Sequence, residues 1–456
     1  MRFIVLFLLT ITAASADPLQ VGRAAVVITP EPGTPMAGYY SIRLATGTHD
    51  DLQAKAIVLA NNGRKAAMVA CDLVAVAPHV VEEARKLASA STGIPPENII
   101  VSATHSHTGP IITGRGARDA NYGGALPAVK RYMESLPKKI AESIIKANSE
   151  LAPARAAVGV GKEGSVAFNR RFHMKDGSVG WNPGKLNPNI LRVAGPVDPD
   201  LAVALFETPS GEPLATYVNY ALHLDTVGGT EWSADYPYTL ARILGAAKGS
   251  DMMTMFTIGA AGNINHIDVS HNRPQKGHGE AERIGTVLAG EVLKTYTRLT
   301  PVDDAPVVTR KETIRLDVAP VTPGDIDRAK TIAAKVGTSE SPRFIDTVFA
   351  FKALDAAARQ KQPYETDIQV IALGKQVAWV SLPGEVFVEL GQAIKQASPF
   401  PVTIVVELAH GPTTYIPNRA AFPQGNYEVV SSRCDIGSGE RLVETAVKLL
   451  KEAYSE

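Results

Sequence analysis

Short apolar runs alternate with amphipathic segments through most of this sequence. Runs rich in valine, isoleucine and alanine, such as Ile99–Ala103, are typical of buried strands. Between them, apolar residues recur at helical spacing, as Leu442, Ala446 and Leu449 do. The predicted strands cover residues 54–60, 66–71, 99–103, 154–160, 214–219, 253–258, 368–373 and 378–382. The predicted helices cover residues 79–91, 126–148, 236–247, 279–297, 322–335, 386–397 and 439–453.

This alternation favours an α/β fold in which a core of mixed β-sheet is layered with helices. The sequence shows no internal repeat, charge block or low-complexity linker, so we expect residues 17–456 to form one domain. Residues 301–365 are richer in helix and charge, and they predict a peripheral helical subdomain. Folds of this class bind ligands at the carboxyl ends of their strands, where functional side chains are therefore expected.

The first residues have the pattern of a secretory signal peptide. Arg2 precedes a short apolar run, and Ala14-Ser15-Ala16 follows as a small-x-small cleavage pattern. We expect cleavage after Ala16 and a protein that is secreted or periplasmic. The run is too short to cross a bilayer core of about 30 Å, and no later segment is apolar for long enough, so no transmembrane anchor is predicted.

Charge and cysteine content exclude further classes of protein. Lysines plus arginines equal aspartates plus glutamates at 46 each, so the formal net charge is zero. This balance gives no reason to expect nucleic acid as a partner. The only two cysteines, Cys71 and Cys434, do not make a disulfide scaffold. Cys71 lies in an apolar run and is expected to be a buried thiol, although a bridge between the two stays open.

The strongest candidate for chemistry follows the predicted strand at 99–103. His105 and His107 are two residues apart, so they leave the strand end on the same face, and Gly109-Pro110 then turns the backbone. A rigid strand end can hold two imidazoles near one point, as metal binding and acid/base chemistry both require. The spacing alone leaves open that both are loop histidines bonded to the backbone.

Other candidates also stand at ends of strand-like runs. His223 lies beside Asp225, Glu385 follows Pro383-Gly384, and Tyr415 lies in a Gly-Pro loop. Each residue also has a purely structural explanation. His223 could be a buried core histidine, Glu385 a carboxylate in the first turn of a helix, and Tyr415 a packed aromatic ring. No nucleophile elbow, P-loop or H-E-x-x-H helix is present, which argues against the familiar serine hydrolases and zincins.

Together these segments resemble the amino-terminal catalytic domain of the neutral, non-lysosomal ceramidase family, from about Val21 onward. The pieces that carry the resemblance are Gly47-Thr48-His49-Asp50-Asp51-Leu52, Thr104-His105-Ser106-His107-Thr108-Gly109-Pro110, Asn169-Arg170, Ala221-Leu222-His223, Pro383-Gly384-Glu385 and Tyr415 with Tyr427-Glu428. Any one of them alone is weak, but their order along the chain is fairly specific.

The resemblance implies one Zn2+ ion per chain and a set of site residues. The implied zinc ligands are His105, His223, Glu385 and Tyr415. His107 would then move protons beside the metal, Arg170 would lie near the substrate carbonyl, and Tyr427 would contact substrate. Asp225 is adjacent to the His223 segment and is a candidate to orient that histidine.

Two features depart from the family pattern. Asn263 falls where ceramide-cleaving members carry a serine, and an amide can bind an oxyanion but cannot act as a nucleophile. The chain also has no room for the immunoglobulin-like domain of the longer members. These features favour attack by metal-activated water on the amide bond of an N-acyl substrate, with sphingolipids among the candidates. A metal-dependent esterase or lactonase and a non-catalytic exported binding protein are the alternatives.

Overall fold

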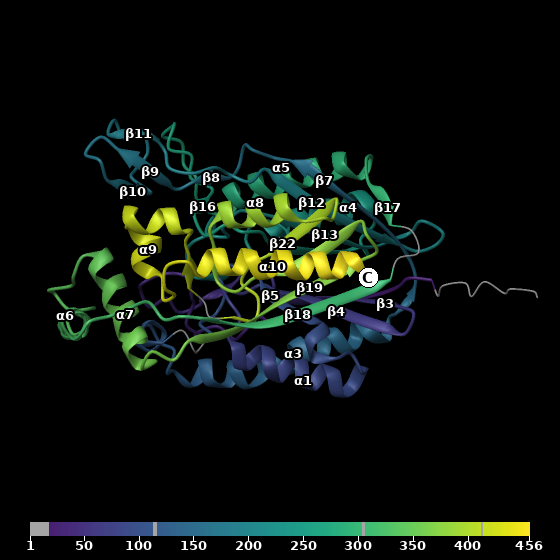
Figure 1. Cartoon of the computed structure of the whole chain (residues 1–456), viewed down its shortest axis with the longest axis horizontal. Helices are drawn as coiled ribbons and strands as arrows, with labels where there is room; N and C mark the ends of the chain where they lie inside the picture. The colour runs from purple at the N-terminus through teal and green to yellow at the C-terminus, as the bar shows by residue number, and fades with distance from the viewer. Residues whose placement is uncertain (1–17, 113–115, 303–305, 412–413) are drawn as a thin grey trace, which may run out of the picture.

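The structure is a computed structural model that describes residues 18–112, 116–302, 306–411 and 414–456. The segment predicted as a signal peptide lies outside these residues. Three larger β-sheets form the centre of the molecule, and helices lie around them (Figure 1). The strand orders are β5-β4-β3-β1-β6, β15-β13-β12-β7-β17 and β18-β19-β20-β22.

The elements have the following bounds. The first sheet contains β5 (Ile99–Ala103), β4 (Arg64–Cys71), β3 (Gln53–Asn61), β1 (Gln20–Val27) and β6 (Ala152–Pro153). The second contains β15 (Met253–Ile258), β13 (Pro213–Tyr220), β12 (Asp200–Glu207), β7 (Arg155–Lys162) and β17 (Thr300–Val302). The third contains β18 (Val307–Leu316), β19 (Tyr364–Leu373), β20 (Val377–Ser381) and β22 (Val402–Val406). The longer helices are α1 (Pro78–Thr92), α3 (Pro127–Ser149), α4 (Tyr236–Lys248), α5 (His278–Tyr296), α6 (Pro323–Ala333), α7 (Phe344–Ala358), α8 (Val388–Ala397) and α10 (Ser438–Ser455).

The same supersecondary unit recurs once in each sheet. An antiparallel hairpin is followed by a helix and then by a strand parallel to the second hairpin strand. The three units are β3-β4-α1-β5, β12-β13-α4-β15 and β19-β20-α8-β22. The sequence carries no repeat that corresponds to them, so the recurrence is one of structure.

The inner strands of each sheet are buried on both faces, which explains why they read as continuous apolar runs. In β3, for example, Ala56 and Val58 face helices α1 and α3, whereas Ile57 and Leu59 face the other two sheets. Helices α4 and α5 cover the second sheet, and α8 and α10 cover the third (Figure 1). The inner faces of all three sheets share one hydrophobic core.

The carboxyl ends of the three parallel strand pairs meet at one place. The Ala103 N–H donates to the Leu408 carbonyl oxygen at 3.2 Å, which joins the first sheet to the loop after β22. The N–H of Glu407, in the same loop, donates to the Ile258 carbonyl oxygen at 3.2 Å, which joins the second sheet to the third. The loops that follow β5, β13 and β20 therefore start close together.

The predicted fold class is confirmed, because mixed sheets layered with helices form the molecule. Each predicted strand and helix corresponds to an observed one, with bounds that shift by a few residues. The prediction missed β1, β12, β18, β22 and α7. Within residues 301–365, β18 pairs with β19 in the third sheet, whereas α6 and α7 pack against each other at one end of the molecule (Figure 1).

Two further expectations concern the cysteines and the membrane. Cys71 and Cys434 are both buried and both free thiols, so they do not form the bridge that the sequence left open. Among the described residues, no helix combines the length and the apolar character that crossing a membrane requires.

Substitution of Trp379 tests the shared inter-sheet core. Trp379 on β20 is fully buried in this core, with its ring centroid 5.7 Å from that of Tyr217 on β13. Trp379→Ala should lower the free energy of unfolding by about 3–5 kcal/mol, because it leaves a large cavity between sheets. Trp379→Phe is the control with a much smaller expected loss. Urea unfolding measures both, and equal losses in the two variants would contradict this account of the core.

Candidate functional site

Five of the residues singled out in the sequence come together where the strand ends meet. His105 and His107 follow β5, His223 follows β13, Glu385 begins β21 (Glu385–Val386), and Tyr415 begins β23 (Tyr415–Ile416). Strands β21 and β23 pair in parallel with Glu385 opposite Tyr415. The cluster thus takes residues from all three repeated units and from the loop after β22.

Three side-chain atoms in this cluster approach one point. Glu385 Oε2 lies 3.4 Å from His105 Nε2 and 3.2 Å from His223 Nε2. His107 Nε2 lies 3.3 Å from His105 Nε2. The side chains of His105, His223 and Glu385 are buried, whereas that of His107 is 13% exposed and faces the opening of the cluster.

Backbone carbonyls fix the orientation of two imidazoles. The His105 Nδ1–H donates to the Val74 oxygen at 2.8 Å, and the His223 Nδ1–H donates to the Ala261 oxygen at 2.9 Å. In a neutral imidazole the remaining nitrogen is an acceptor. Both Nε2 atoms therefore present lone pairs toward Glu385 Oε2, which has no hydrogen-bond partner among the described residues.

The protonation states follow from burial and from these neighbours. Burial, assisted by Arg170 and His105, lowers the pKa of His223 to about 4. Burial alone would raise the pKa of Glu385, but His105 and His223 outweigh it and hold that pKa well below its usual value. Near neutral pH, a neutral His223 and an ionised Glu385 thus stand side by side.

A group of converging acceptors suits a cation. Ligand atoms at about 2.0–2.2 Å from a tetrahedral ion lie about 3.3–3.6 Å apart, close to the separations found here. His105, His107 and His223 each offer a ring nitrogen, and these nitrogens lie within 4.8 Å of one another. The described residues therefore contain a histidine cluster that can hold a metal ion.

The turn that carries His105 and His107 is fixed by neighbouring loops. His105 has a left-handed backbone with φ of 80°, and its N–H donates to the Leu73 oxygen at 2.9 Å. The hydroxyls of Ser106 and Thr108 donate to the Ser233 oxygen at 2.6 and 2.8 Å. Asp50 in turn accepts from the Ser233 hydroxyl at 2.6 Å. The Asp50 motif therefore supports the histidine turn without entering the cluster.

A glycine allows the backbones of two site loops to touch. The Gly262 N–H donates to the Val386 oxygen at 2.8 Å. A Cβ at Gly262 would lie only 2.4 Å from the Glu385 carbonyl oxygen, so any side chain there would push β21 away. The position of Glu385 thus depends on the loop after β15.

Arg170 reaches the cluster from β8 (Phe168–Asn169) and is held by a buried carboxylate. Its Nε donates to Glu428 at 2.9 Å, and the neighbouring Arg171 donates to the other oxygen of Glu428 at 2.8 Å. Arg170 Nη2 donates to the Gly262 oxygen at 2.6 Å. Nη1 lies 3.4 Å from His223 Nε2 and is the guanidinium nitrogen nearest the cluster. Glu428 is fully buried, and its role was not recognised from the sequence.

Aromatic rings line one side of the cluster. The Tyr415 and Tyr427 ring centroids lie 5.3 Å apart, and Trp181 lies 4.4 Å from Tyr427. Phe344 stacks on Trp181 at 5.6 Å and is 41% exposed. Burial, assisted by Glu385, raises the pKa of the Tyr415 hydroxyl well above its usual value. An apolar wall therefore runs from Tyr415 to the surface.

The amide of Asn263, which the sequence proposes as a substrate contact, already has two partners at the start of α8. Its Oδ1 accepts from the Val388 N–H at 2.9 Å, and its Nδ2 donates to Glu389 at 3.0 Å. The first N–H groups of a helix lack partners within that helix, and this amide satisfies one of them at the start of α8. Both polar atoms of the Asn263 side chain therefore already have hydrogen-bond partners.

Asp225 is also placed differently from the sequence expectation. The Ala261 carbonyl, not Asp225, receives the Nδ1–H of His223. Asp225 Oδ1 instead lies 3.6 Å from Nδ1 of His107 and accepts a hydrogen bond from the Tyr39 hydroxyl. Tyr39 and Asp225 are 186 positions apart, so no local sequence signal could have linked them.

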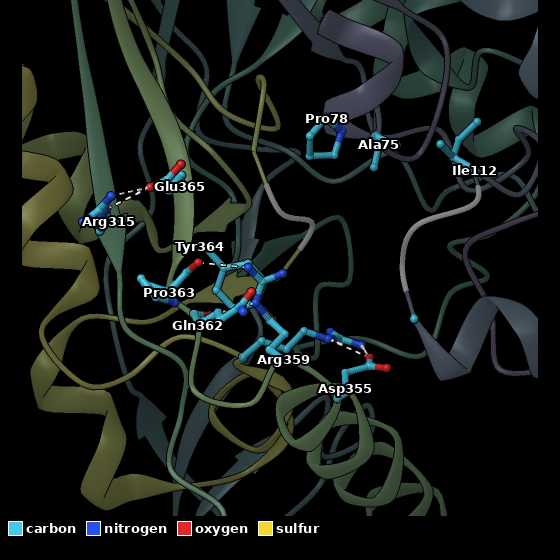
Figure 2. Close-up of a pocket in the computed structure, with 14 residues that line it drawn as sticks. Ala75, Pro78, Ile112, Arg315, Asp355, Arg359, Gln362, Pro363, Tyr364 and Glu365 are labelled. Carbon is cyan, nitrogen blue, oxygen red and sulfur yellow. Dashed lines mark hydrogen bonds and ion pairs between the residues drawn. The ribbon is translucent and has the colours of Figure 1, made fainter.

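A cavity of about 880 Å³ opens beside the start of α1, and Figure 2 shows its lining. It contains the ion pairs Arg315–Glu365 and Arg433–Asp355, and Arg359 lies over the Tyr364 ring at 3.9 Å. None of the five clustered residues lines this cavity. The histidine cluster is therefore the better candidate for the reaction site.

Comparison with known proteins gives one consistent result. The neutral ceramidase of Pseudomonas aeruginosa is 29% identical over 218 residues, which are 46% of this chain and 30% of that protein. Neutral ceramidase B of Dictyostelium discoideum is 25% identical over 202 residues, 43% of this chain and 27% of that protein. A crystal structure of the Pseudomonas aeruginosa enzyme matches 96% of this chain and 75% of the other, with a TM-score of 0.75 and 18% identity.

The chain resembles the neutral ceramidases in sequence and shares their fold. A structure described as a ceramidase complexed with C2 agrees, with a TM-score of 0.72 over 95% of this chain and 17% identity. The sequence matches span less than a third of the length of the curated neutral ceramidases. No family model matches.

Loss of the Glu428 carboxylate tests the arrangement that holds Arg170. Glu428→Gln should lower the free energy of unfolding by about 3–5 kcal/mol, because it leaves two buried guanidinium groups without a counter-charge. Thermal and urea unfolding measure this loss. The control is Glu282→Gln, which breaks an exposed pair with Arg242 and should leave stability unchanged. A Glu428 variant as stable as this control would contradict the assignment.

Proposed function

We propose that this protein is a zinc-dependent amidohydrolase of the ceramidase type, which cleaves the amide bond of an N-acyl substrate. The observation that carries the proposal is that two imidazole nitrogens, His105 Nε2 and His223 Nε2, lie 3.4 and 3.2 Å from Glu385 Oε2. The similarity to neutral ceramidases supports it. Export, which the pattern of residues 1–16 predicts, belongs to the same proposal.

In this proposal one Zn2+ ion per chain is held by His105, His223, Glu385 and Tyr415. Two imidazole nitrogens and a carboxylate oxygen are ligand atoms that zinc takes readily. Glu385 Oε2 is buried and without a hydrogen-bond partner among the described residues, as expected for an atom that binds a cation. When bound, zinc would supply an acidified water and polarise the substrate carbonyl.

His107 is proposed to move the proton that amide cleavage requires. Its Nε2 faces the cluster, 3.3 Å from His105 Nε2, and its ring is partly open to solvent. Burial, together with His105 and His223, holds the pKa of His107 well below its usual value, so the resting imidazole is neutral. A neutral imidazole in this position can take a proton from the attacking water and return it to the leaving amine.

Arg170 and Tyr427 are proposed to hold the substrate beside the metal ligands. Glu428 and the Gly262 carbonyl fix Arg170, while Nη1 points to the cluster and can donate to the carbonyl oxygen. Tyr427 stands beside Tyr415 in the aromatic wall. Such a wall suits the apolar part of an N-acyl group, for which sphingolipids are one candidate class.

Ester cleavage is the competing activity, because the same arrangement also polarises an ester carbonyl. Amides differ in that their leaving amine needs a proton, and the placement of His107 beside the cluster favours that reaction. Rates on matched N-acyl amide and ester substrates would separate the two activities. A protein that cleaves only esters would overturn the amide assignment.

Removal of proposed ligands should abolish metal binding. His223→Ala and Glu385→Ala should reduce bound zinc from one ion per chain to almost none, because each deletes a donor that no described neighbour replaces. Plasma emission spectrometry of dialysed protein measures zinc directly. The control is His271→Ala, a surface histidine paired with Asp268, which should keep its zinc. Full zinc occupancy in Glu385→Ala would refute the ligand set.

His107→Ala separates proton transfer from metal binding. The variant should keep one zinc ion per chain but hydrolyse amides about 10²–10⁴ times more slowly, the usual contribution of a general acid/base. Zinc content and kcat are measured on the same preparation. Loss of zinc from this variant would instead make His107 a ligand, as the grouping of His105, His107 and His223 also allows.

A further inference from the structure

Asp225 lies directly against His107 at the opening of the cluster. Its Oδ1 is 3.6 Å from His107 Nδ1, and that nitrogen is buried without a hydrogen-bond partner among the described residues. The Tyr39 hydroxyl donates to the same carboxylate oxygen. The Tyr39 ring also meets the imidazole edge to face, with centroids 5.7 Å apart.

The backbone of His107 is already fixed by other contacts. Its N–H donates to the Leu224 oxygen at 3.0 Å, and its carbonyl accepts from Arg43 Nη2 at 2.7 Å. Gly38 packs so closely that a Cβ there would lie 2.8 Å from His107 Cβ. These contacts fix the backbone of His107 but not its ring. The rotation and the tautomer of the imidazole therefore depend on the group that faces Nδ1.

The other two imidazoles show what is missing at His107. Val74 and Ala261 accept the Nδ1–H of His105 and His223, so their tautomers are set by the backbone. For His107, the acceptor nearest Nδ1 is the side chain of Asp225. A carboxylate that receives one ring N–H leaves the opposite nitrogen as the acceptor, which here is Nε2 facing the cluster.

We infer that Asp225, held by Tyr39, is a positioning residue that fixes His107 in the Nδ1–H tautomer with Nε2 directed at the reacting atoms. Only the kinetic consequence of this inference rests on the proposed function. The separation of 3.6 Å exceeds a hydrogen bond and is expected to shorten when substrate fills the opening, as such contacts do in active sites. Asp225 acts through His107 and makes no contact with substrate.

Nuclear magnetic resonance of protein labelled with 15N-histidine tests the tautomer directly. His107→Ala assigns the His107 signals. The wild-type protein should show the Nδ1–H tautomer at His107, and Asp225→Ala should lose that preference while His105 and His223 keep theirs. An unchanged His107 tautomer in Asp225→Ala would overturn the inference. This readout needs no substrate, so it stands even if the protein proves inactive on amides and the proposed function fails.

Kinetics test whether Asp225 works through His107. Asp225→Ala should lower kcat about 10- to 100-fold with KM and zinc content nearly unchanged, as for other residues that orient an active-site histidine. In a protein that already carries His107→Ala, adding Asp225→Ala should lower kcat no further. A full additional loss there would give Asp225 a separate role and contradict the inference. If Asp225→Ala does not fold, Asp225→Leu replaces it in both experiments with the same expectations, because leucine is of similar size and has no hydrogen-bond acceptor.

Asp268→Ala is the matched control. Asp268 Oδ2 lies 3.5 Å from His271 Nε2, and its side chain is 26% exposed, against 3.6 Å and 28% for Asp225 with His107. The Asp268→Ala substitution therefore removes a comparable aspartate–histidine contact that lies away from the cluster. Its kcat and the His107 tautomer should match the wild-type protein. Tyr39→Phe removes the hydroxyl that holds Asp225 and should give a smaller loss of kcat than Asp225→Ala.

Discussion

The site depends on a few backbone hydrogen bonds that tie three sheets together at their strand ends. Leu408 accepts from Ala103 of the first sheet, and Glu407 donates to Ile258 of the second. Parallel neighbours end at the same sheet edge, so each repeated unit delivers its next loop to this junction. The histidines and Glu385 enter the cluster from those loops, and their separations are set by the sheets more than by the loops themselves.

Charge around the junction is partly balanced by partners that lie outside the cluster. The single Glu428 carboxylate pairs with both Arg170 and Arg171, so it offsets only part of the positive charge that stands beside His223. Glu407 is buried next to Glu385, and burial with that neighbour raises the pKa of Glu407 well above its usual value. The pKa of Glu385 is instead held well below its usual value, so Glu385 is the ionised carboxylate that faces the imidazoles. A buried cation at this point would meet its negative charge.

The sequence predicted most of the strands that are buried on both faces, such as β4 and β5, because their apolar runs are continuous, although it missed β12 and β22. It missed β18, whose alternating burial leaves charged residues such as Lys311 and Arg315 on one face of an edge strand, and it placed that segment in a helical subdomain. It singled out His105, His223 and Glu385 because each follows a strand end. It gave no sign that the amide of Asn263 binds the first N–H of α8, and it could not find Tyr39, since only tertiary packing brings that residue to Asp225.

The recurrence of one unit in three sheets has a consequence for how the site comes into being. The clustered residues span positions 105 to 415, and no single unit holds more than a part of the set. During synthesis the three histidines leave the ribosome before Glu385 and Tyr415 do, so a partly made chain has histidines but no complete site. The cluster is therefore complete only when segments from all three sheets are present.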